Sequence, residues 1–453
     1  MPDLKYGKHV FWISSAISLI FYILISYLTP RHESLPLLIY YSFLFIAFLL
    51  IYGVSNREPY VNYAYMAGIA FRLSLLFLVP NLSDDVYRFI WDGRLTAHGI
   101  NPYVFPPEHF LSKPGYEDIG LTHSLFDLFG KNTHSSYPPV DQLIFAMAVL
   151  ISPRSLFGSI LVIRVTILAF EAGNILIIRK LLKTGGKPVR LGLLYVLNPL
   201  VILELTGNLH FEGIMIFFLL LTLWFIRNNG FIPAGIAVGL SILVKLLPLI
   251  FLPYFWIRYR KKGFVLVALS VIIIISGFLP FLWIDSVRGF LESLALYFYK
   301  LEFNASIYFL VRQIGYWAAG FNIIWIAGPL LGFLAFLLII YLSFSDYAKK
   351  VRTEETVMWL LMIYLAMTTT LHPWYVITLL VLCIFTEYRF PLVWTFFIFF
   401  TYEGYSVDGY QPDYWWIGLE YLVIYGIMLW EIRTVPEFHS SPVTRGMNRI
   451  VRG

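Results

Sequence analysis

Long apolar runs alternate along this chain with short polar segments. Most of the runs approach the ~20 residues that an α-helix needs to cross a bilayer. The pattern predicts an all-α polytopic membrane protein with about 12–14 transmembrane helices in one domain, residues 1–432. The runs at 191–205, 248–258 and 390–403 are short enough to be half-helices. The apolar runs lie at roughly 10–28, 36–53, 61–79, 157–178, 191–205, 212–227, 231–246, 248–258, 264–284, 322–344, 356–371, 373–388, 390–403 and 414–432.

Two segments break this alternation. Residues 80–156 are too polar to cross a membrane and too long for a simple connector, so we expect a functional loop that contains juxtamembrane helices. Its last apolar run, 139–152, is below the ~17-residue minimum for a span and is expected to lie along the membrane face. Residues 285–321 have amphipathic, aromatic character and predict a second loop at that face.

The basic residues predict the orientation. The segment 179–190 carries five Lys and Arg residues and is expected to be cytoplasmic, as are Lys5, Lys8 and the basic tail 433–453. If both termini are cytoplasmic, an even number of spans must precede 179–190. The short run 139–152 then cannot cross, and the loop 80–156 lies outside. We therefore predict a multi-pass protein of the plasma (inner) membrane with an extracytoplasmic site.

Composition agrees with this class. Hydrophobic residues make up 59% of the chain, charged residues 13%, and the mean hydropathy is +0.74, which excludes an ordinary soluble domain. The net charge of +6 comes from short basic runs between apolar segments, so we expect no nucleic-acid partner. Cys383 is the only cysteine, which excludes an intrachain disulfide and a cysteine-cluster metal site.

The segment Ser83–Tyr103 is the most informative polar stretch. Ser83 is suited to cap a helix, Gly99 to end it, and Pro102 to stop it, which predicts a helix over about 84–98. Asp85, Arg88 and Asp92 then share one face.

Further polar groups fall beside apolar spans at the same predicted outer face. Such groups are costly there and are functional candidates by default. Simpler roles compete with function: helix capping for the adjacent acids, backbone hydrogen bonding for the histidines, snorkelling for Lys245, and an interfacial belt for Trp374 and Tyr375. The candidates are Asp84, Asp85, Arg88, Asp92, Tyr137, Glu204, Asn208, His210, Glu212, Lys245, His372, Trp374 and Tyr375.

An enzyme with carboxylates outside the cytoplasm has no nucleotide-activated substrate within reach. Its activated donor must arrive through the membrane, and a polyprenyl-phosphate sugar meets that need. A lipid phosphate leaves as a stabilised anion, so one carboxylate acting as general base toward the acceptor hydroxyl suffices.

Five motifs carry a resemblance, in order: DDVYRFIWDGRLTAHGINPY, SSYPPV, NPLVILELTGNLHFEG, LVKLLPLIFLP and LHPWYV. Together they resemble the GT-C superfamily of membrane glycosyltransferases, and within it the bacterial polyprenyl-phosphate-mannose-dependent mannosyltransferases. The resemblance implies inverting transfer of one hexose, mannose being favoured, to a lipid or glycan acceptor. It implies that an acid of the first outer loop is the base; Asp84 and Asp85 both match, and the face shared with Arg88 and Asp92 favours Asp85.

The remaining candidates are assigned to substrate binding. For the donor phosphate and sugar we expect Arg88, Lys245, His210, His372, Trp374 and Tyr375. For the acceptor or the cavity wall we expect Asp92, Tyr137, Glu204, Asn208 and Glu212. No metal ligand is assigned, because two adjacent carboxylates do not define a site, although they leave a divalent cation as an open alternative. The alternative function is a transporter or flippase of lipid-linked sugars, for which pseudo-symmetric halves are expected; we find no such repeat.

Overall fold

The computed structural model describes residues 2–407 and 409–435, and this part of the chain is almost entirely helical. The tail 433–453 therefore lies largely outside the described residues. Two short strands, β1 (Tyr405–Ser406) and β2 (Gly409–Tyr410), form an antiparallel hairpin. The prediction of an all-α polytopic membrane protein is confirmed.

Six helical segments in the described ranges are long and apolar enough to cross a membrane, or seven if a pair bent by 52° at residues 197–198 is one span. The predicted 12–14 crossings stay a prediction, because the other expected spans are shorter helices. The long segments contain α1 (Pro2–Ile23, continued by a π-helix Leu24–Leu28), α2 (Ser34–Val54), α8 (Leu156–Thr184), α13 (Leu252–Phe278), α16 (Ile324–Phe344) and α21 (Tyr414–Thr434).

The shorter helices match most of the remaining apolar runs. The run 191–205 is the bent pair, as its length suggested. The runs 248–258 and 264–284 form the merged helix α13, which breaks at Arg260 (φ 50°, ψ −119°), within the polar gap that separates them. The shorter helices are α3 (Tyr60–Ser74), α9 (Leu193–Val196), α10 (Pro199–Val201, followed by a π-helix Ile202–Gly207), α11 (Glu212–Arg227), α12 (Phe231–Val244), α17 (Asp346–Lys350), α18 (Thr353–Met367), α19 (Tyr375–Cys383) and α20 (Phe390–Phe397). Four 3₁₀ segments beside them are Val189–Gly192, Leu247–Phe251, Leu279–Phe281 and Ile398–Gly404.

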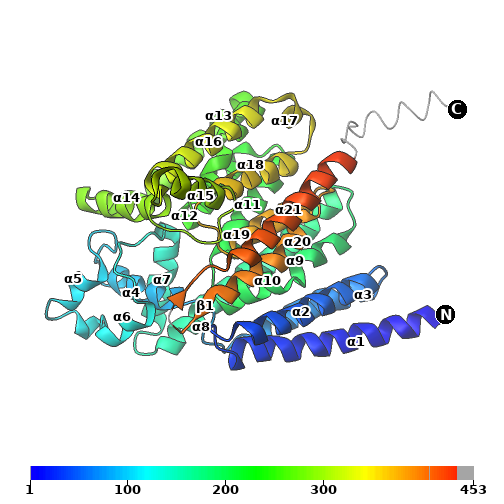
Figure 1. Cartoon of the computed structure of the whole chain (residues 1–453), viewed down its shortest axis with the longest axis horizontal. Coiled ribbons are helices and arrows are strands. Elements are labelled where there is room, and N and C mark those ends of the chain that lie inside the picture. The colour runs from blue at the N-terminus through cyan, green and yellow to red at the C-terminus, as the bar shows by residue number, and fades with distance from the viewer. Residues whose placement is uncertain (1, 408, 436–453) are drawn as a thin grey trace.

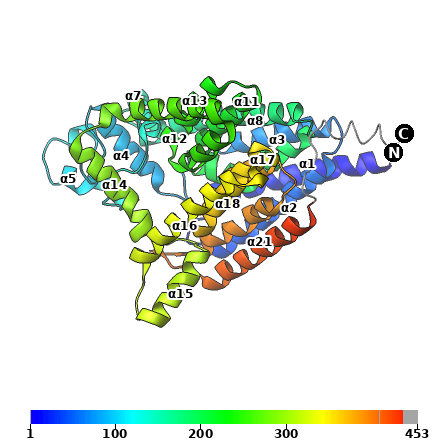
Figure 2. The same cartoon turned by 90° about the horizontal axis from the view of Figure 1, so that it is seen from above.

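The two polar loops pack together at one end of the helices. Figures 1 and 2 place α4 and α5 at that end, and the start of α1 and the end of α21 at the other. The loops are joined by Ser293, whose hydroxyl donates to the His134 carbonyl at 3.0 Å. Their helices are α4 (Asp85–Ala97), α5 (Pro107–Leu111), α6 (His123–Phe129), α7 (Pro139–Ile151), α14 (Ile284–Tyr299) and α15 (Ile307–Ala319), with a 3₁₀ turn at Glu117–Ile119.

Helix α4 confirms the predicted helix with two differences at its start. The N-cap residue is Asp84, whose side chain makes no capping bond; the Ser83 hydroxyl accepts from the Asp85 amide at 3.3 Å instead. At the other end His98 is the C-cap, and Gly99 follows at φ +71°, a conformation that glycine adopts readily. The helix therefore presents Asp85 at its first turn.

A buried ion pair ties α3 to α8. Arg72, 2% exposed, donates to Glu171 through Nε at 3.1 Å and Nη2 at 3.0 Å. The third guanidinium nitrogen, Nη1, donates to the Val196 carbonyl at 2.6 Å, which fixes the chain just before the bend at residues 197–198. The ion pair therefore holds α3 and α8 together beside the bent segment that leads to Glu204, Asn208 and His210.

Glu171→Ala is expected to lower the free energy of unfolding by about 3–5 kcal/mol, because it leaves Arg72 charged and buried without its carboxylate. SDS-induced unfolding of the purified protein measures this. The exposed acid Glu58 provides the control: Glu58→Ala is expected to change stability by less than about 0.5 kcal/mol. Equal stability of the two variants would contradict a structural role for the pair.

Candidate active site

A cavity of about 490 Å³ lies where the two polar loops meet the helix ends. We call it the carboxylate cavity, since Asp84 and Asp85 both line it. Its wall comes from both loops, from the segment before α11, from the turn between α18 and α19, and from the β-hairpin. Of the predicted site residues it gathers Asp84, Asp85, Arg88, Tyr137, His210, Lys245, His372, Trp374 and Tyr375.

Asp85 is the more enclosed of the two acids. Its side chain is 19% exposed, and its Oδ1 accepts from Lys131 Nζ at 3.0 Å. Burial is the largest single influence and would raise the pKa of Asp85, but attraction to Lys131 and His210, together with the Lys131 hydrogen bond, outweighs burial and holds the pKa below its usual range. Asp85 is therefore an ionised carboxylate that faces a cavity at neutral pH, as a general base must be.

Asp84 has a different partner and is more open. Its side chain is 42% exposed, and Oδ2 lies 2.8 Å from Arg31 Nη2. The Arg31 guanidinium in turn lies 4.6 Å from the centre of the Tyr405 ring. Asp84 thus links the end of α1 and the β-hairpin to the cavity rim.

Arg88 and Asp92, which the helical spacing places on one face, form an ion pair with Nε to Oδ1 at 2.8 Å. Arg88 reaches the cavity, whereas Asp92 is fully buried behind it and does not line the wall. Asp92 also accepts from the hydroxyl of Ser135 at 2.5 Å and from the Gln142 amide at 3.3 Å. Asp92 was expected to bind the acceptor or line the cavity; in the structure it lies behind the wall and holds Arg88 in place.

Four rings form a stack along one wall. His372 lies 4.5 Å from both the Phe303 and Trp374 ring centres, and Trp374 lies 3.5 Å from His210. Burial lowers the pKa of His372 to about 3, so its imidazole is neutral at pH 7. Because the rings stack on one another, the faces of Trp374 and His372 are covered by their neighbours, and His372 supplies no positive charge to the cavity.

Glu204 and Asn208 lie behind this stack and do not line the cavity wall. Glu204 is fully buried; it accepts from Tyr402 at 2.8 Å and from Asn208 at 3.1 Å, and its Oε2 lies 3.4 Å from His210 Nε2. Leu209, at φ +64°, turns the chain so that His210 enters the cavity. The sequence-based expectation that both residues line the cavity differs from the structure, where they support His210.

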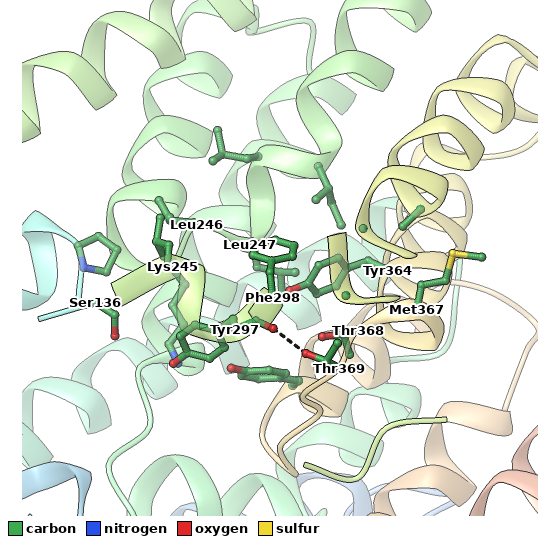
Figure 3. Close-up of a pocket in the computed structure, with 18 of the residues that line it drawn as sticks. Ser136, Lys245, Leu246, Leu247, Tyr297, Phe298, Tyr364, Met367, Thr368 and Thr369 are labelled. Carbon is green, nitrogen blue, oxygen red and sulfur yellow. Dashed lines mark hydrogen bonds between the residues drawn. The ribbon is translucent and has the colours of Figure 1, made fainter. Parts of the chain in front are cut away.

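Lys245 lies where the carboxylate cavity meets a second, apolar cavity of about 350 Å³. Its Nζ lies 2.5 Å from Oε1 of Glu212, which lines only the apolar cavity. Figure 3 shows Lys245 and Tyr297 near Ser136, with Phe298 and Met367 farther along the apolar cavity. The two cavities share five lining residues: Ser136, Tyr137, Lys245, Tyr297 and Tyr375.

Sequence reasoning missed the partners of the two acids, Lys131 and Arg31, and the ring residues Tyr297, Phe303 and Tyr405. Lys131 is in the first loop, 46 residues after Asp85, and no local spacing connects them. Phe303 is placed by main-chain bonds: its amide donates to Thr369 at 3.1 Å and its carbonyl accepts from Leu371 at 2.7 Å. The one available signal was the excess of polar and aromatic residues in both loops.

Within the described ranges, no group of three or more His, Cys, Asp and Glu side chains is placed to hold a metal ion. The described residues therefore offer no donor set that supports the alternative of a bound divalent cation. The charges that face the cavity interior are instead the carboxylates and the side chains of Arg31, Arg88, Lys131 and Lys245.

Comparison with known proteins identifies the family. The family model described as alpha-(1->6)-mannopyranosyltransferase, N-terminal domain, matches residues 25–260, just over half of the chain. The chain belongs to this family. The matched segment carries Asp84, Asp85, Arg88, His210 and Lys245, and the resemblance to membrane mannosyltransferases is confirmed.

Individual relatives in this mannopyranosyltransferase family are distant. Alpha-(1->6)-mannopyranosyltransferase B of Corynebacterium glutamicum is 29% identical over 153 residues, 33% of this chain and 24% of the relative. The A enzymes of the same bacterium and of Mycobacterium tuberculosis are 23% and 25% identical over 193 and 197 residues, 42% of this chain in both cases. The aligned regions cover 38% and 36% of those two proteins, so all three matches span well under two thirds of the relatives.

Proposed function

We propose that the protein transfers one mannosyl group from a polyprenyl-phosphate donor to a hydroxyl of a lipid or glycan acceptor. The observation that carries this proposal is the junction of the two cavities. An ionised carboxylate lies in one, mostly apolar side chains line the other, and Lys245 and Tyr297 lie between them. The names of the relatives, alpha-(1->6)-mannopyranosyltransferases, support mannose as the transferred sugar and an α-(1→6) bond in the product.

The proposed reaction is a single displacement. The acceptor oxygen attacks the anomeric carbon, the bond from that carbon to the phosphate oxygen breaks, and the configuration inverts. Asp85 takes the acceptor proton, and polyprenyl phosphate leaves with the electron pair as an anion. Lys245 and Arg88 stabilise the negative charge of the phosphate. His372 is neutral and supplies no positive charge for this role.

The ring stack and the β-hairpin support binding of the sugars. His210, Trp374 and His372 line one wall of the cavity as a ring stack, and Tyr405 and Tyr410 line the hairpin side. The polyprenyl chain is assigned to the apolar cavity, between α14, α16 and α18. We assign the carboxylate cavity to the extracytoplasmic side, since the basic segment 179–190 belongs to the opposite ends of the helices.

The decisive assay uses purified protein in vesicles with a polyprenyl-phosphate mannose labelled in the sugar. Transfer is expected to release free polyprenyl phosphate and to place the label on an acceptor extracted from the native envelope. A lipid-linked-sugar transporter would move the intact donor to the other leaflet and release no polyprenyl phosphate. That second result would exclude the proposed enzyme.

Lys131 is expected to set the acid limit of the reaction. In Lys131→Met, burial acts on Asp85 without its main opposing charge, so the Asp85 pKa rises. Protonated Asp85 cannot act as base, and the acid limb of the kcat/KM profile moves to higher pH by about one unit or more. Lys131→Arg should keep the wild-type profile, and Lys113→Met removes an exposed charge of the same loop as a control. An unmoved acid limb would exclude Asp85 as the group that titrates.

A further inference from the structure

A third cavity, of about 650 Å³, lies at the far ends of the helices that build the active site. Helix α11 runs from Glu212, beside Lys245, to Arg227 in the wall of this cavity, roughly 22 Å away at 1.5 Å per residue. Helices α12 and α18 begin at this cavity and end at the apolar cavity, whereas α19 runs in the same direction as α11. We call it the basic cavity. It is separate from the site described above.

Charge in the basic cavity is unbalanced. Six basic and three acidic side chains line it, which leaves a net charge of +3. Two of the acids are committed to wall residues: Glu387 lies 2.7 Å from Lys187, and Glu354 lies 2.7 Å from Arg227. The other four lining cations, Arg258, Lys262, Lys350 and Arg352, lie outside these two pairs; counted with the third acid, Glu355, they account for the net charge of +3.

The two pairs fix the walls, and the excess positive charge of the cavity comes from the four other cations. Glu354 is 3% exposed and anchors the start of α18, next to Arg352. Lys262 lies 5.5 Å from the centre of the Phe231 ring, and Arg258 donates to the main-chain carbonyl of Lys349, so neither is neutralised by these contacts. Like charges around one cavity repel each other, and an anion between them removes that cost.

The shape and chemistry of the cavity select the kind of anion. Arginine and lysine together match a phosphate group, through paired N–H donors and a point charge. The rest of the wall is mixed: apolar side chains such as Ile226, Phe231 and Phe385 line it together with Thr and Asn side chains, and the volume exceeds that of one phosphate ion. We propose that the basic cavity binds a phosphate group carried on an apolar body, as in an anionic membrane lipid of the leaflet opposite the active site.

Native mass spectrometry of the full-length, delipidated protein tests this proposal. Phosphatidylglycerol, phosphatidylcholine and inorganic phosphate are titrated separately onto the wild type and onto Lys262→Gln/Arg352→Gln. The wild type is expected to retain phosphatidylglycerol over phosphatidylcholine, and the double variant to lose about tenfold in that affinity. Protection against thermal unfolding by inorganic phosphate alone would assign the same site to a soluble phosphate compound.

A matched control separates this site from general surface charge. Arg57→Gln/Arg433→Gln removes two exposed basic residues outside the cavity and is expected to bind phosphatidylglycerol as the wild type does. Thermal unfolding without ligand checks that each variant is folded. The proposal is overturned if the control loses as much affinity as the cavity variant, or if neither phosphatidylglycerol nor inorganic phosphate binds in preference to the zwitterionic phosphatidylcholine.

Discussion

Asp85→Asn is expected to lower kcat by about 10²–10⁴-fold while donor binding is kept, because the amide cannot take the acceptor proton. Its side chain has the same shape, and the substitution removes only the charge that faces Lys131 at 3.0 Å. Release of polyprenyl phosphate measures turnover, and binding of labelled donor under non-turnover conditions measures affinity.

The neighbouring acid supplies the control. Asp84→Asn also removes one carboxylate from the same cavity, but this carboxylate is 42% exposed and pairs with Arg31 at the rim. A loss below about tenfold is expected, in line with an exposed ion pair. If Asp84→Asn abolished turnover and Asp85→Asn kept it, the base would have to be reassigned to Asp84.

Lys245→Met is expected to give the second large effect, a fall of about 10²–10³-fold in kcat/KM, since it removes a cation assigned to the leaving phosphate. The affinity for the phosphate donor should fall, whereas the affinity for an apolar polyprenol that competes for the apolar cavity should not. Inhibition by polyprenol should therefore change little, and competition assays compare the two.

A structural effect has to be separated from this chemical one. Lys245→Met leaves Glu212 buried without its 2.5 Å partner, which by itself destabilises a protein. The double variant Lys245→Met/Glu212→Gln removes that unpaired charge. We expect it to recover thermal stability and to remain as inactive as the single variant. Recovery of activity together with stability would show that Lys245 acts only through folding.

The first loop shows how far local sequence patterns reach. Ser83, Gly99 and Pro102 predicted α4 to within about one residue, and the helical spacing placed Arg88 and Asp92 on one face, where they form an ion pair. The same pattern placed Asp85 on their face, yet Asp85 pairs with Lys131 across 46 residues. Helical spacing specifies which side chains are near each other on one helix, and it carries no information about a loop that folds back.

The division between wall residues and supporting residues could not be predicted either. Asp92, Glu204 and Asn208 have the same polar character as Asp85 and His210, and they occur in the same motifs. Their depth is set by neighbouring elements: Gln142 of α7 covers Asp92, and Tyr402 covers Glu204. Burial depends on what packs against a side chain, which is a property of the assembled helices.

The sequence by itself determined the class of protein, its helical elements, the first-loop acids and the relation to mannosyltransferases. These follow from hydrophobicity and local spacing, which act over a few residues and survive in any folded arrangement. Only the tertiary structure decided that Asp85 is paired with Lys131, that Lys245 joins a polar cavity to an apolar one, and that six basic residues surround a cavity at the far helix ends. Such contacts join segments tens to hundreds of residues apart, and the packing of the helices against one another selects them.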